Sequence, residues 1–343
     1  HVPVRGRMEG QVKLIIQIPC YNEAGTIALT LKELPRQVAG FDSVEWLIID
    51  DGSTDGTAAV ASTSGADHII TLSKNKGLAT AFMAGLEASL ELGADVIVNT
   101  DADNQYHAAD IPALVAPILD GRADIVIGAR PIDTVEHFSM SKRLLQKLGS
   151  YVVRLASKTD VADAPSGFRA ISREAALQLN VFNGNTYTLE TIIQAGQKNM
   201  TVVSVPIRIN KDLRPSRLIK SVPAYVKRSM NTIVRIFAVY QPFRFFMTIG
   251  LITFAAGVLL GLRYLYFLIY YFVTGTDIRA HIQSLILSSI LLGLGFQAML
   301  VAFIADLLSV NRRLLENIQY RLRSSHPSMH EKKDKKHGVQ EKN

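Results

Sequence analysis

Two long apolar runs in the last third of the chain constrain its architecture more than any other feature. No charged residue interrupts residues 245–262 or residues 282–305. A helix needs about 20 apolar residues to cross a lipid bilayer, and both runs reach this length, the first by continuing past Arg263. Because the connection at residues 274–281 is short, we expect a hairpin of two transmembrane helices. A pair of helices buried inside a soluble domain is the alternative.

Basic residues gather on both sides of this apolar region. The chain carries 37 Lys and Arg against 30 Asp and Glu, a net charge of +7. The excess lies around residues 211–244 and 312–342, so the positive-inside rule places both flanks, and the N-terminal domain with them, in the cytoplasm. No nucleic-acid-binding motif accompanies the charge, which argues against a nucleic-acid partner. The single cysteine, Cys20, excludes a disulfide within the chain and agrees with a reducing compartment.

Two features near the membrane have more than one explanation. Arg263 interrupts the first span, and an arginine at the centre of a transmembrane helix costs at least about 2.5 kcal/mol. We expect this residue to extend toward the membrane surface or to pair with another group. Residues 215–243 mix basic and apolar side chains as helices on a membrane surface do. Packing of these helices against the N-terminal domain is the alternative.

The N-terminal part of the chain alternates short apolar strands with helices. This alternation predicts an α/β domain with a mainly parallel sheet that helices cover on both faces. Ligands of such sheets bind beyond the carboxyl ends of the strands. The expected strands are residues 12–18, 46–49, 68–72, 95–100, 124–127 and 201–206, and the expected helices are residues 24–38, 54–62, 76–92, 111–119, 140–157, 173–179 and 189–198.

Acidic residues follow two of the predicted strands. Asp101 and Asp103 come after the fourth strand, and two carboxylates at that spacing can share a hard divalent cation, to which Gln105 can add an oxygen ligand. Such a cation would neutralise a diphosphate and stabilise it as a leaving group. Residues 50–53, Asp-Asp-Gly-Ser, follow the second strand. Their carboxylates can accept hydrogen bonds from a base or ribose, or they can simply stabilise a turn.

Six motifs together resemble those of the family 2 glycosyltransferases. The order and spacing are similar to the branch that loads sugars onto polyprenyl phosphates, the dolichol-phosphate mannose synthase-like enzymes. The resemblance covers about residues 13–209, and the hairpin is similar to that of the longer members. The motifs are Ile-Pro-Cys-Tyr-Asn-Glu at 18–23, Asp-Asp-Gly-Ser-Thr-Asp at 50–55, Asn-Lys-Gly at 75–77, Asp-Ala-Asp-Asn-Gln at 101–105, Gly-Ala-Arg at 128–130 and Ser-Gly-Phe-Arg at 166–169.

The resemblance implies a fold, a reaction and a cofactor. The fold would be GT-A, with a Rossmann-like sheet. The reaction would be the inverting transfer of a sugar from a nucleotide diphosphate to the phosphate of a membrane polyprenyl phosphate. Uridine and guanosine donors both occur in the family, and the short loops expected to line the pocket favour UDP over GDP. The cofactor would be Mg²⁺ or Mn²⁺. A phosphate acceptor is already anionic at neutral pH, so arginines that hold it matter more than a general base.

The resemblance also implies roles for individual residues. It assigns Pro19, Tyr21, Glu23, Asp51, Ser53, Lys76, Asp101, Ala102, Asp103 and Gln105 to the donor, with Asp101, Asp103 and Gln105 on the metal. It assigns Arg130, Lys142, Arg143, Ser166 and Arg169 to the acceptor phosphate. Arg208, Arg214, Ser216 and Arg217 would belong to a loop over the donor. Asp103, Asp163, Arg130 and Arg143 are the expected catalytic residues, with Asp163 orienting the arginines or acting as a base.

Two rival functions follow from other interpretations of the same motifs. A processive polysaccharide synthase shares the donor motifs but carries Gln-x-x-Arg-Trp, and the only tryptophan here is Trp46 in an early strand. A catalytically silent membrane scaffold that binds sugar nucleotides is the second rival. Glycines in both apolar runs permit close helix packing, within the chain or in a homo-oligomer.

The expected organisation has five segments. Residues 1–10 would be a disordered cloning remnant before and around Met8, with no secretory signal peptide. The other segments are the glycosyltransferase domain at 11–214, the interfacial helices at 215–243, the hairpin at 244–310 with spans near 245–273 and 281–308, and a basic helix with a disordered tail at 311–343.

Overall fold

The computed structural model describes residues 11–131, 154, 157, 159–181, 187–210, 234–235, 238–275 and 282–325. The chain divides into two compact units. The first joins His1–Ser229 with Glu316–Asn343, and the second is Met230–Leu315. The expected cloning remnant, most of the expected interfacial helices and most of the C-terminal tail lie outside the described residues.

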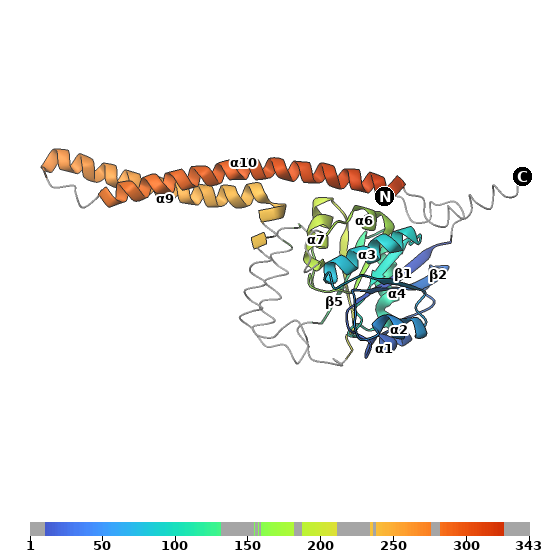
Figure 1. Ribbon diagram of the computed structural model, residues 1–343. Helices are drawn as coiled ribbons and strands as arrows, with labels where there is room; N and C mark the ends of the chain where they lie inside the picture. Colours follow the sequence, from blue (N-terminus) through green and yellow to red (C-terminus); the bar gives the residue numbers. More distant parts are fainter. Residues whose placement is uncertain are drawn as a thin grey trace, which may run out of the picture. The chain divides into compact units, whose positions relative to one another are not determined.

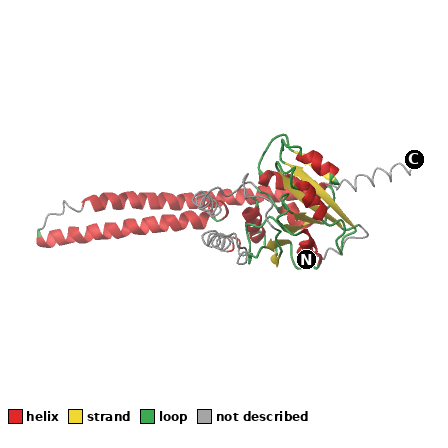
Figure 2. Ribbon diagram, turned by 90° about the horizontal axis from the view of Figure 1, so that it is seen from below, coloured by secondary structure: helices red, strands yellow, loops and turns green. Residues whose placement is uncertain are grey.

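A seven-stranded sheet forms the framework of the first unit (Figures 1 and 2). Its strand order is β3-β2-β1-β4-β6-β5-β7, and every pairing is parallel except those of β6 with β4 and β5. The predicted α/β class and mainly parallel sheet are therefore confirmed. The strands are β1 (Lys13–Cys20), β2 (Ser43–Asp50), β3 (His68–Thr71), β4 (Val96–Asn99), β5 (Ile125–Ala129), β6 (Arg169–Ser172) and β7 (Val202–Pro206).

Helices cover both faces of this sheet because alternate residues of each strand point to opposite sides. From β1, Leu14 and Ile16 enter the main apolar core, whereas Gln17 points to the helix that contains Gly85. The helices of this unit are α1 (Ile27–Glu33), α2 (Thr57–Thr63), α3 (Leu78–Glu91), α4 (Ile111–Leu119), α6 (Arg173–Gln178) and α7 (Thr188–Gln197).

Two elements differ from the sequence-based expectation. The helix expected over residues 24–38 is confined to α1, because Leu34 precedes Pro35 and adopts an extended conformation with ψ of 139°. Strand β6 is not predicted at all. It has four residues, begins at Arg169, the last residue of the motif at 166–169, and lies antiparallel between two parallel strands.

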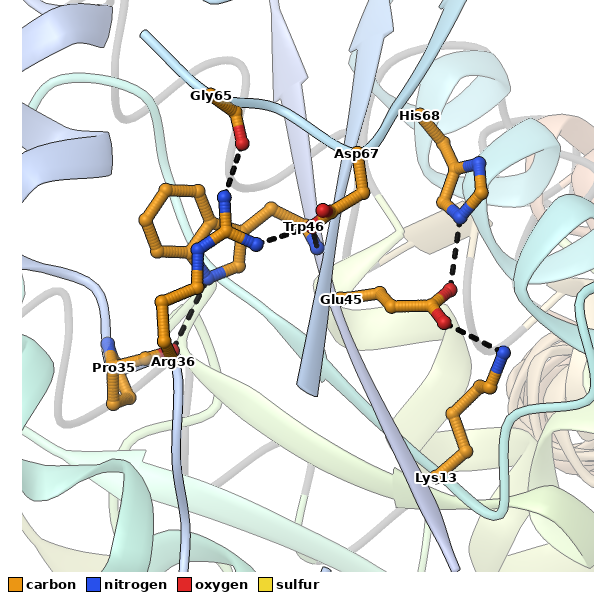
Figure 3. A network of polar contacts seen from close by, with 8 residues as sticks. All are labelled: Lys13, Pro35, Arg36, Glu45, Trp46, Gly65, Asp67 and His68. Carbon is orange, nitrogen blue, oxygen red and sulfur yellow. Dashed lines mark hydrogen bonds and ion pairs between the residues drawn. The ribbon is translucent and has the colours of Figure 1, made fainter. Parts of the chain in front are cut away.

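A polar network connects β1, β2 and β3 near their N-terminal ends (Figure 3). It lies away from the edge of the sheet where the carboxyl ends of the parallel strands meet, which is called the rim below. Glu45 accepts hydrogen bonds from Lys13 Nζ at 2.7 Å and lies 2.8 Å from His68 Nε2. Burial alone would raise the pKa of Glu45, but the bonds to Lys13 and His68 outweigh it and hold the pKa below its ordinary value of 4.5. Beside this network, Arg36 stacks on the ring of Trp46.

We predict that Glu45→Gln destabilises the protein at pH 7 by roughly 0.5–1.5 kcal/mol, because the charged hydrogen bonds are lost. A lowered carboxyl pKa stabilises the fold above the ordinary pKa, and this stability disappears as the pH falls through the folded-state value. Wild type and variant should therefore converge below about pH 4. Urea unfolding followed by the fluorescence of Trp46 measures this. Asp120→Asn, which removes an exposed ion pair with Arg122, is the control and should change little.

The second unit consists mainly of one long apolar helix and the greater part of another, which run side by side (Figure 2). Helix α9 is Pro242–Thr274, and α10 is Ile282–Ser325. Both are long and apolar enough to cross a membrane. The second expected span and the basic segment after it form one continuous helix. Arg263 lies over the ring of Phe267 on its own helix, with 5.9 Å between guanidinium carbon and ring centroid.

Glycines allow the backbones of α9 and α10 to meet. A Cβ added to Gly295 would lie 2.6 Å from the backbone nitrogen of Phe254, and one added to Gly257 would lie 2.9 Å from the backbone nitrogen of Leu292. Ser288 Oγ donates a hydrogen bond of 2.7 Å to the Gly257 carbonyl. By contrast, a Cβ on Gly293 would have open space around it. Gly257 and Gly295 therefore allow close packing of the two helices within the chain.

We expect Gly295→Leu to destabilise the hairpin by roughly 1–3 kcal/mol, as overpacking does in other cores. Gly293→Leu is the matched control, since it adds the same side chain two residues away, where a Cβ has open space around it. Thermal unfolding in detergent, followed by circular dichroism at the helix band, should show a lower midpoint for Gly295→Leu alone. Equal midpoints for the two variants would contradict the packing described.

Candidate active site

The loops after β1 and β2 are hydrogen-bonded to each other at the carboxyl-end rim. The Asn22 amide donates to Ser53 Oγ at 2.9 Å, and the Thr54 amide donates to Asn22 Oδ1 at 2.9 Å. The Glu23 amide donates to Thr57 Oγ1 at 2.9 Å. These reciprocal hydrogen bonds hold the two loops together along one edge of the site. The expected donor-binding residues on that edge are Pro19, Tyr21, Glu23 and Ser53.

Asp50 and Asp51 stabilise two different turns. Asp50 Oδ1 accepts a hydrogen bond of 2.9 Å from the Ser53 amide, so the turn-stabilising explanation holds for this residue. The two carboxylate oxygens of Asp51 accept from the amides of Lys76 and Gly77, each at 2.8 Å. Asp51 thereby fixes the chain that enters α3 and leaves the exposed side chain of Lys76 at the rim.

The segment Asp101–Gln105 follows β4, and hydrogen bonds from α1 and within the segment hold it in place. The buried Ala102 carbonyl accepts a hydrogen bond of 2.9 Å from Thr30 Oγ1 in α1. Asn104 has a φ of 57°, in the left-handed region that asparagine tolerates better than most residues. The Gln105 amide donates to Asp103 Oδ1 at 3.3 Å. These contacts leave both aspartates half-buried at the rim.

Asp101 lies in an unfavourable environment for a negative charge. Burial raises the pKa of Asp101 to about 7, and the neighbouring Asp103 carboxylate adds to the increase. Arg130 opposes it, together with a hydrogen bond from Tyr106. Desolvation and repulsion of like charges are both relieved when a cation binds between carboxylates.

The residues at this point fit a hard divalent cation. Carboxylate and amide oxygens are its preferred protein ligands, and Mg²⁺ usually takes one or two carboxylates plus phosphate oxygens and water. Among the described residues, no group of three or more His, Cys, Asp or Glu is arranged to hold a metal. Asp101 and Asp103, with Gln105, would therefore hold a cation whose other ligands come from the substrate and water.

Arg130 and Asp163 form a nearly buried ion pair beside the aspartates. Arg130 Nε lies 2.7 Å from Asp163 Oδ2, and Nη2 lies 3.1 Å from Oδ1. Burial alone would lower the pKa of Arg130, but the Asp163 carboxylate outweighs this and raises it. The bidentate geometry favours Asp163 as the residue that orients Arg130 over a role as a base.

Arg169 does not lie where the sequence predicts it. It is fully buried at the start of β6, so its guanidinium does not face the rim. Ser166, another expected acceptor ligand, is also fully buried. Arg169 braces the loop that precedes β6, and its assignment to the acceptor phosphate stays a prediction. Its guanidinium donates hydrogen bonds to the carbonyls of Ala164, Ser166 and Thr188 and to the hydroxyl of Thr191.

Arg208 is paired within the protein. Its Nε and Nη2 donate to Asp110 Oδ1 at 2.9 and 2.6 Å, and its backbone amide donates to Asp110 Oδ2 at 2.7 Å. The pair anchors the chain after β7 to the start of α4. The other expected residues of the donor loop and acceptor site, Lys142, Arg143, Arg214, Ser216 and Arg217, lie outside the described residues.

Two polar residues near Asp101 are not singled out by the sequence analysis. The hydroxyl of Tyr106 accepts a hydrogen bond of 3.0 Å from the Gly167 amide. Asn99, the last residue of β4, donates to the Gly167 carbonyl at 2.8 Å and to the Tyr187 hydroxyl at 2.9 Å. A buried asparagine inside an apolar strand was the available signal for Asn99.

Comparison with known proteins identifies the family. The model of Glycosyl transferase family 2 matches residues 15–179. The UDP-N-acetylglucosamine–dolichyl-phosphate N-acetylglucosaminyltransferase of Methanococcus voltae is 30% identical over 215 residues, which are 56% of this chain and 83% of that protein. The chain belongs to glycosyl transferase family 2. This glycosyltransferase is also 28% identical over 218 residues to the undecaprenyl-phosphate mannosyltransferase of Micrococcus luteus, which covers 60% of this chain and 88% of that protein.

Solved structures confirm the fold of the glycosyltransferase domain. Glucosyl-3-phosphoglycerate synthase from Mycobacterium tuberculosis, in complex with phosphoglyceric acid, superposes with a TM-score of 0.51 at 22% identity. The match covers 67% of this chain and 80% of that chain. The GT-A-like arrangement expected from the sequence is therefore present.

We predict that Asp163→Asn lowers the free energy of unfolding by about 3–5 kcal/mol, because the nearly buried guanidinium of Arg130 loses the carboxylate that pairs with it. Arg130→Met should also be destabilising, because the buried Asp163 carboxylate loses both hydrogen bonds from the guanidinium. The double variant Arg130→Met, Asp163→Asn should be less destabilised than the sum of the single variants. Urea denaturation of all four proteins gives this double-mutant cycle, and strict additivity would contradict direct pairing.

Proposed function

We propose that this glycosyltransferase moves a sugar from a nucleotide diphosphate to the phosphate of a membrane polyprenyl phosphate, with inversion and with a divalent cation. The observation that carries the proposal is the juxtaposition of two carboxylates, Asp101 and Asp103, with the ion-paired Arg130. One side of the site suits a cation and diphosphate, and the other suits an anionic acceptor.

The donor half of the proposal rests on the rim. A cation held by Asp101, Asp103 and Gln105 would neutralise the charge that develops on the leaving diphosphate. The interlocked loops that carry Tyr21 and Ser53 would hold the nucleoside. UDP is favoured over GDP, because the name of the Methanococcus voltae relative includes UDP-N-acetylglucosamine.

The acceptor part of the proposal rests on the positive charge of Arg130 and on the names of related proteins. Phosphate monoesters are already anionic at neutral pH, so the acceptor oxygen needs positioning more than deprotonation. Arg130 is held rigidly by both oxygens of Asp163 and would align that phosphate. Undecaprenyl, polyprenol and dolichyl phosphates appear in the names of three relatives, from Micrococcus luteus, Mycolicibacterium smegmatis and Methanococcus voltae.

The apolar helices supply the location of the reaction. Helices α9 and α10 would anchor the enzyme in the membrane that holds the lipid acceptor. The basic flanks favour a catalytic domain on the cytoplasmic face. A polyprenyl phosphate carries its phosphate at that surface, within reach of a domain attached there.

We predict that the purified full chain forms a lipid-linked sugar from at least one nucleotide sugar when polyprenyl phosphate and Mn²⁺ are present. Asp103→Ala should lower turnover by at least about a hundredfold, because the diphosphate loses a cation ligand. The exposed Asp120→Asn variant is the control. Thin-layer chromatography of extracted lipid measures the product. Nucleotide binding without product for any donor in a panel of UDP- and GDP-sugars would sink the proposal.

A further inference from the structure

We propose that Asn210 is a positioning residue for the cation, because it fixes the turn at Asn104 that lies between two expected cation ligands, Asp103 and Gln105. The inference rests on the proposed function, which assigns both ligands to the cation. Asn210 itself is not a ligand. It follows β7 and reaches the Asp101–Gln105 segment from a distant part of the sequence.

The turn at Asn104 has a conformation that its surroundings must maintain. Asn104 has a φ of 57°, which few non-glycine residues adopt and which persists where neighbouring contacts fix it. The residue is also buried, with 5% of its surface exposed. The turn brings the Gln105 amide to 3.3 Å from Asp103 Oδ1. Contacts that fix Asn104 therefore determine how Asp103 and Gln105 lie relative to each other.

Asn210 supplies such contacts through its side chain and its backbone. Its Nδ2 donates a hydrogen bond of 3.0 Å to the Asn104 carbonyl, and its backbone amide donates one of 2.9 Å to the Gln105 carbonyl. Nδ2 also lies 3.3 Å from Glu33 Oε2 and 3.5 Å from the Tyr106 carbonyl. All three neighbours of Nδ2 are oxygen acceptors, so only the amino group of the amide suits this position.

The chain that carries Asn210 is held in place on both sides of the turn. Ile209 forms an antiparallel bridge with Tyr106. Arg208 is ion-paired with Asp110, with 2.6 Å between Nη2 and Oδ1. These contacts restrain the backbone from which the Asn210 side chain extends, so the side chain can hold the turn and not merely follow it.

A restrained hydrogen-bond donor behind a metal ligand affects metal binding. Outer partners of this kind orient the ligand, and their loss typically costs about 10–100-fold in metal affinity. Asn210 bonds directly to the backbone of Gln105, and it acts on Asp103 through the turn at Asn104. Without the Asn210 amide, the turn can relax to a negative φ, which would separate the two ligands.

Two variants of Asn210 test the inference. Asn210→Leu removes the amide with little change in side-chain volume, and Asn210→Ala removes it without placing an apolar group beside Glu33. Both keep the backbone bond to Gln105. Asp124→Ala is the matched control, because Asp124 Oδ2 accepts a bond of 2.7 Å from the Thr201 amide. This side-chain-to-backbone bond also holds the chain beside β7, but at the end away from the rim.

Mn²⁺ binding to the detergent-solubilised full chain, with saturating UDP, can be measured by electron paramagnetic resonance of the free ion. We expect both Asn210 variants to weaken Mn²⁺ binding by roughly tenfold or more. Asp124→Ala should stay within about threefold of wild type, although its thermal midpoint falls by a similar amount, since each variant loses hydrogen bonds to the backbone. The Mn²⁺ concentration that gives half-maximal turnover should rise in the Asn210 variants, whereas kcat at saturating Mn²⁺ should change much less.

Wild-type Mn²⁺ affinity in either folded Asn210 variant overturns the inference. An equal loss of affinity in Asp124→Ala overturns it too, because the effect would then follow general destabilisation. A wild-type protein that binds no Mn²⁺ removes both the inference and the proposed cation site. Weakened Mn²⁺ binding in the Asn210 variants alone, with no lipid-linked sugar formed by wild type, supports the inference and rejects the proposed acceptor.

Discussion

The desolvated carboxylate of Asp101 is the constraint on which the arrangement of the site depends. It lies at the end of β4, with a second carboxylate two residues further along and a pKa raised by burial to about 7. A protein gains nothing in stability from such a placement, because both desolvation and like-charge repulsion disfavour the ionised pair. Arg130 and Tyr106 reduce the unfavourable free energy of the ionised Asp101 carboxylate without removing it. A bound cation would relieve what remains.

The surrounding structure can be understood as support for that carboxylate. Asp163 holds Arg130, Arg169 holds the loop that carries Gly167, and Gly167 holds Tyr106. Strand β6 makes this possible, because its antiparallel course places its first residue, Arg169, opposite Asn99 at the end of β4. Rigid support of this kind keeps charged groups oriented before substrate arrives, which is the main source of electrostatic catalysis.

The position of the rim could be predicted from the sequence because polar clusters follow apolar strands. This pattern can be recognised without knowing how the side chains pack. It could not tell which way a side chain points. Arg169 follows a rim motif yet lies in the interior, where carbonyl groups engage its guanidinium. Tyr106 and Asn99 escaped notice because buried aromatic and strand residues are usually core. Strand β6 has four residues, too few for a periodic pattern, and Pro35 shortened α1 through a local steric effect.

The central claim is that Asp101 and Asp103 bind a divalent cation together with a nucleotide diphosphate. Crystals or cryo-electron microscopy grids of the full chain with Mn²⁺ and UDP test it most directly, and anomalous scattering from crystals identifies the metal. We predict a Mn²⁺ peak in contact with carboxylate oxygens of both residues and with the diphosphate. A bound diphosphate with no Mn²⁺ between it and these carboxylates, or Mn²⁺ at another position, would contradict the account.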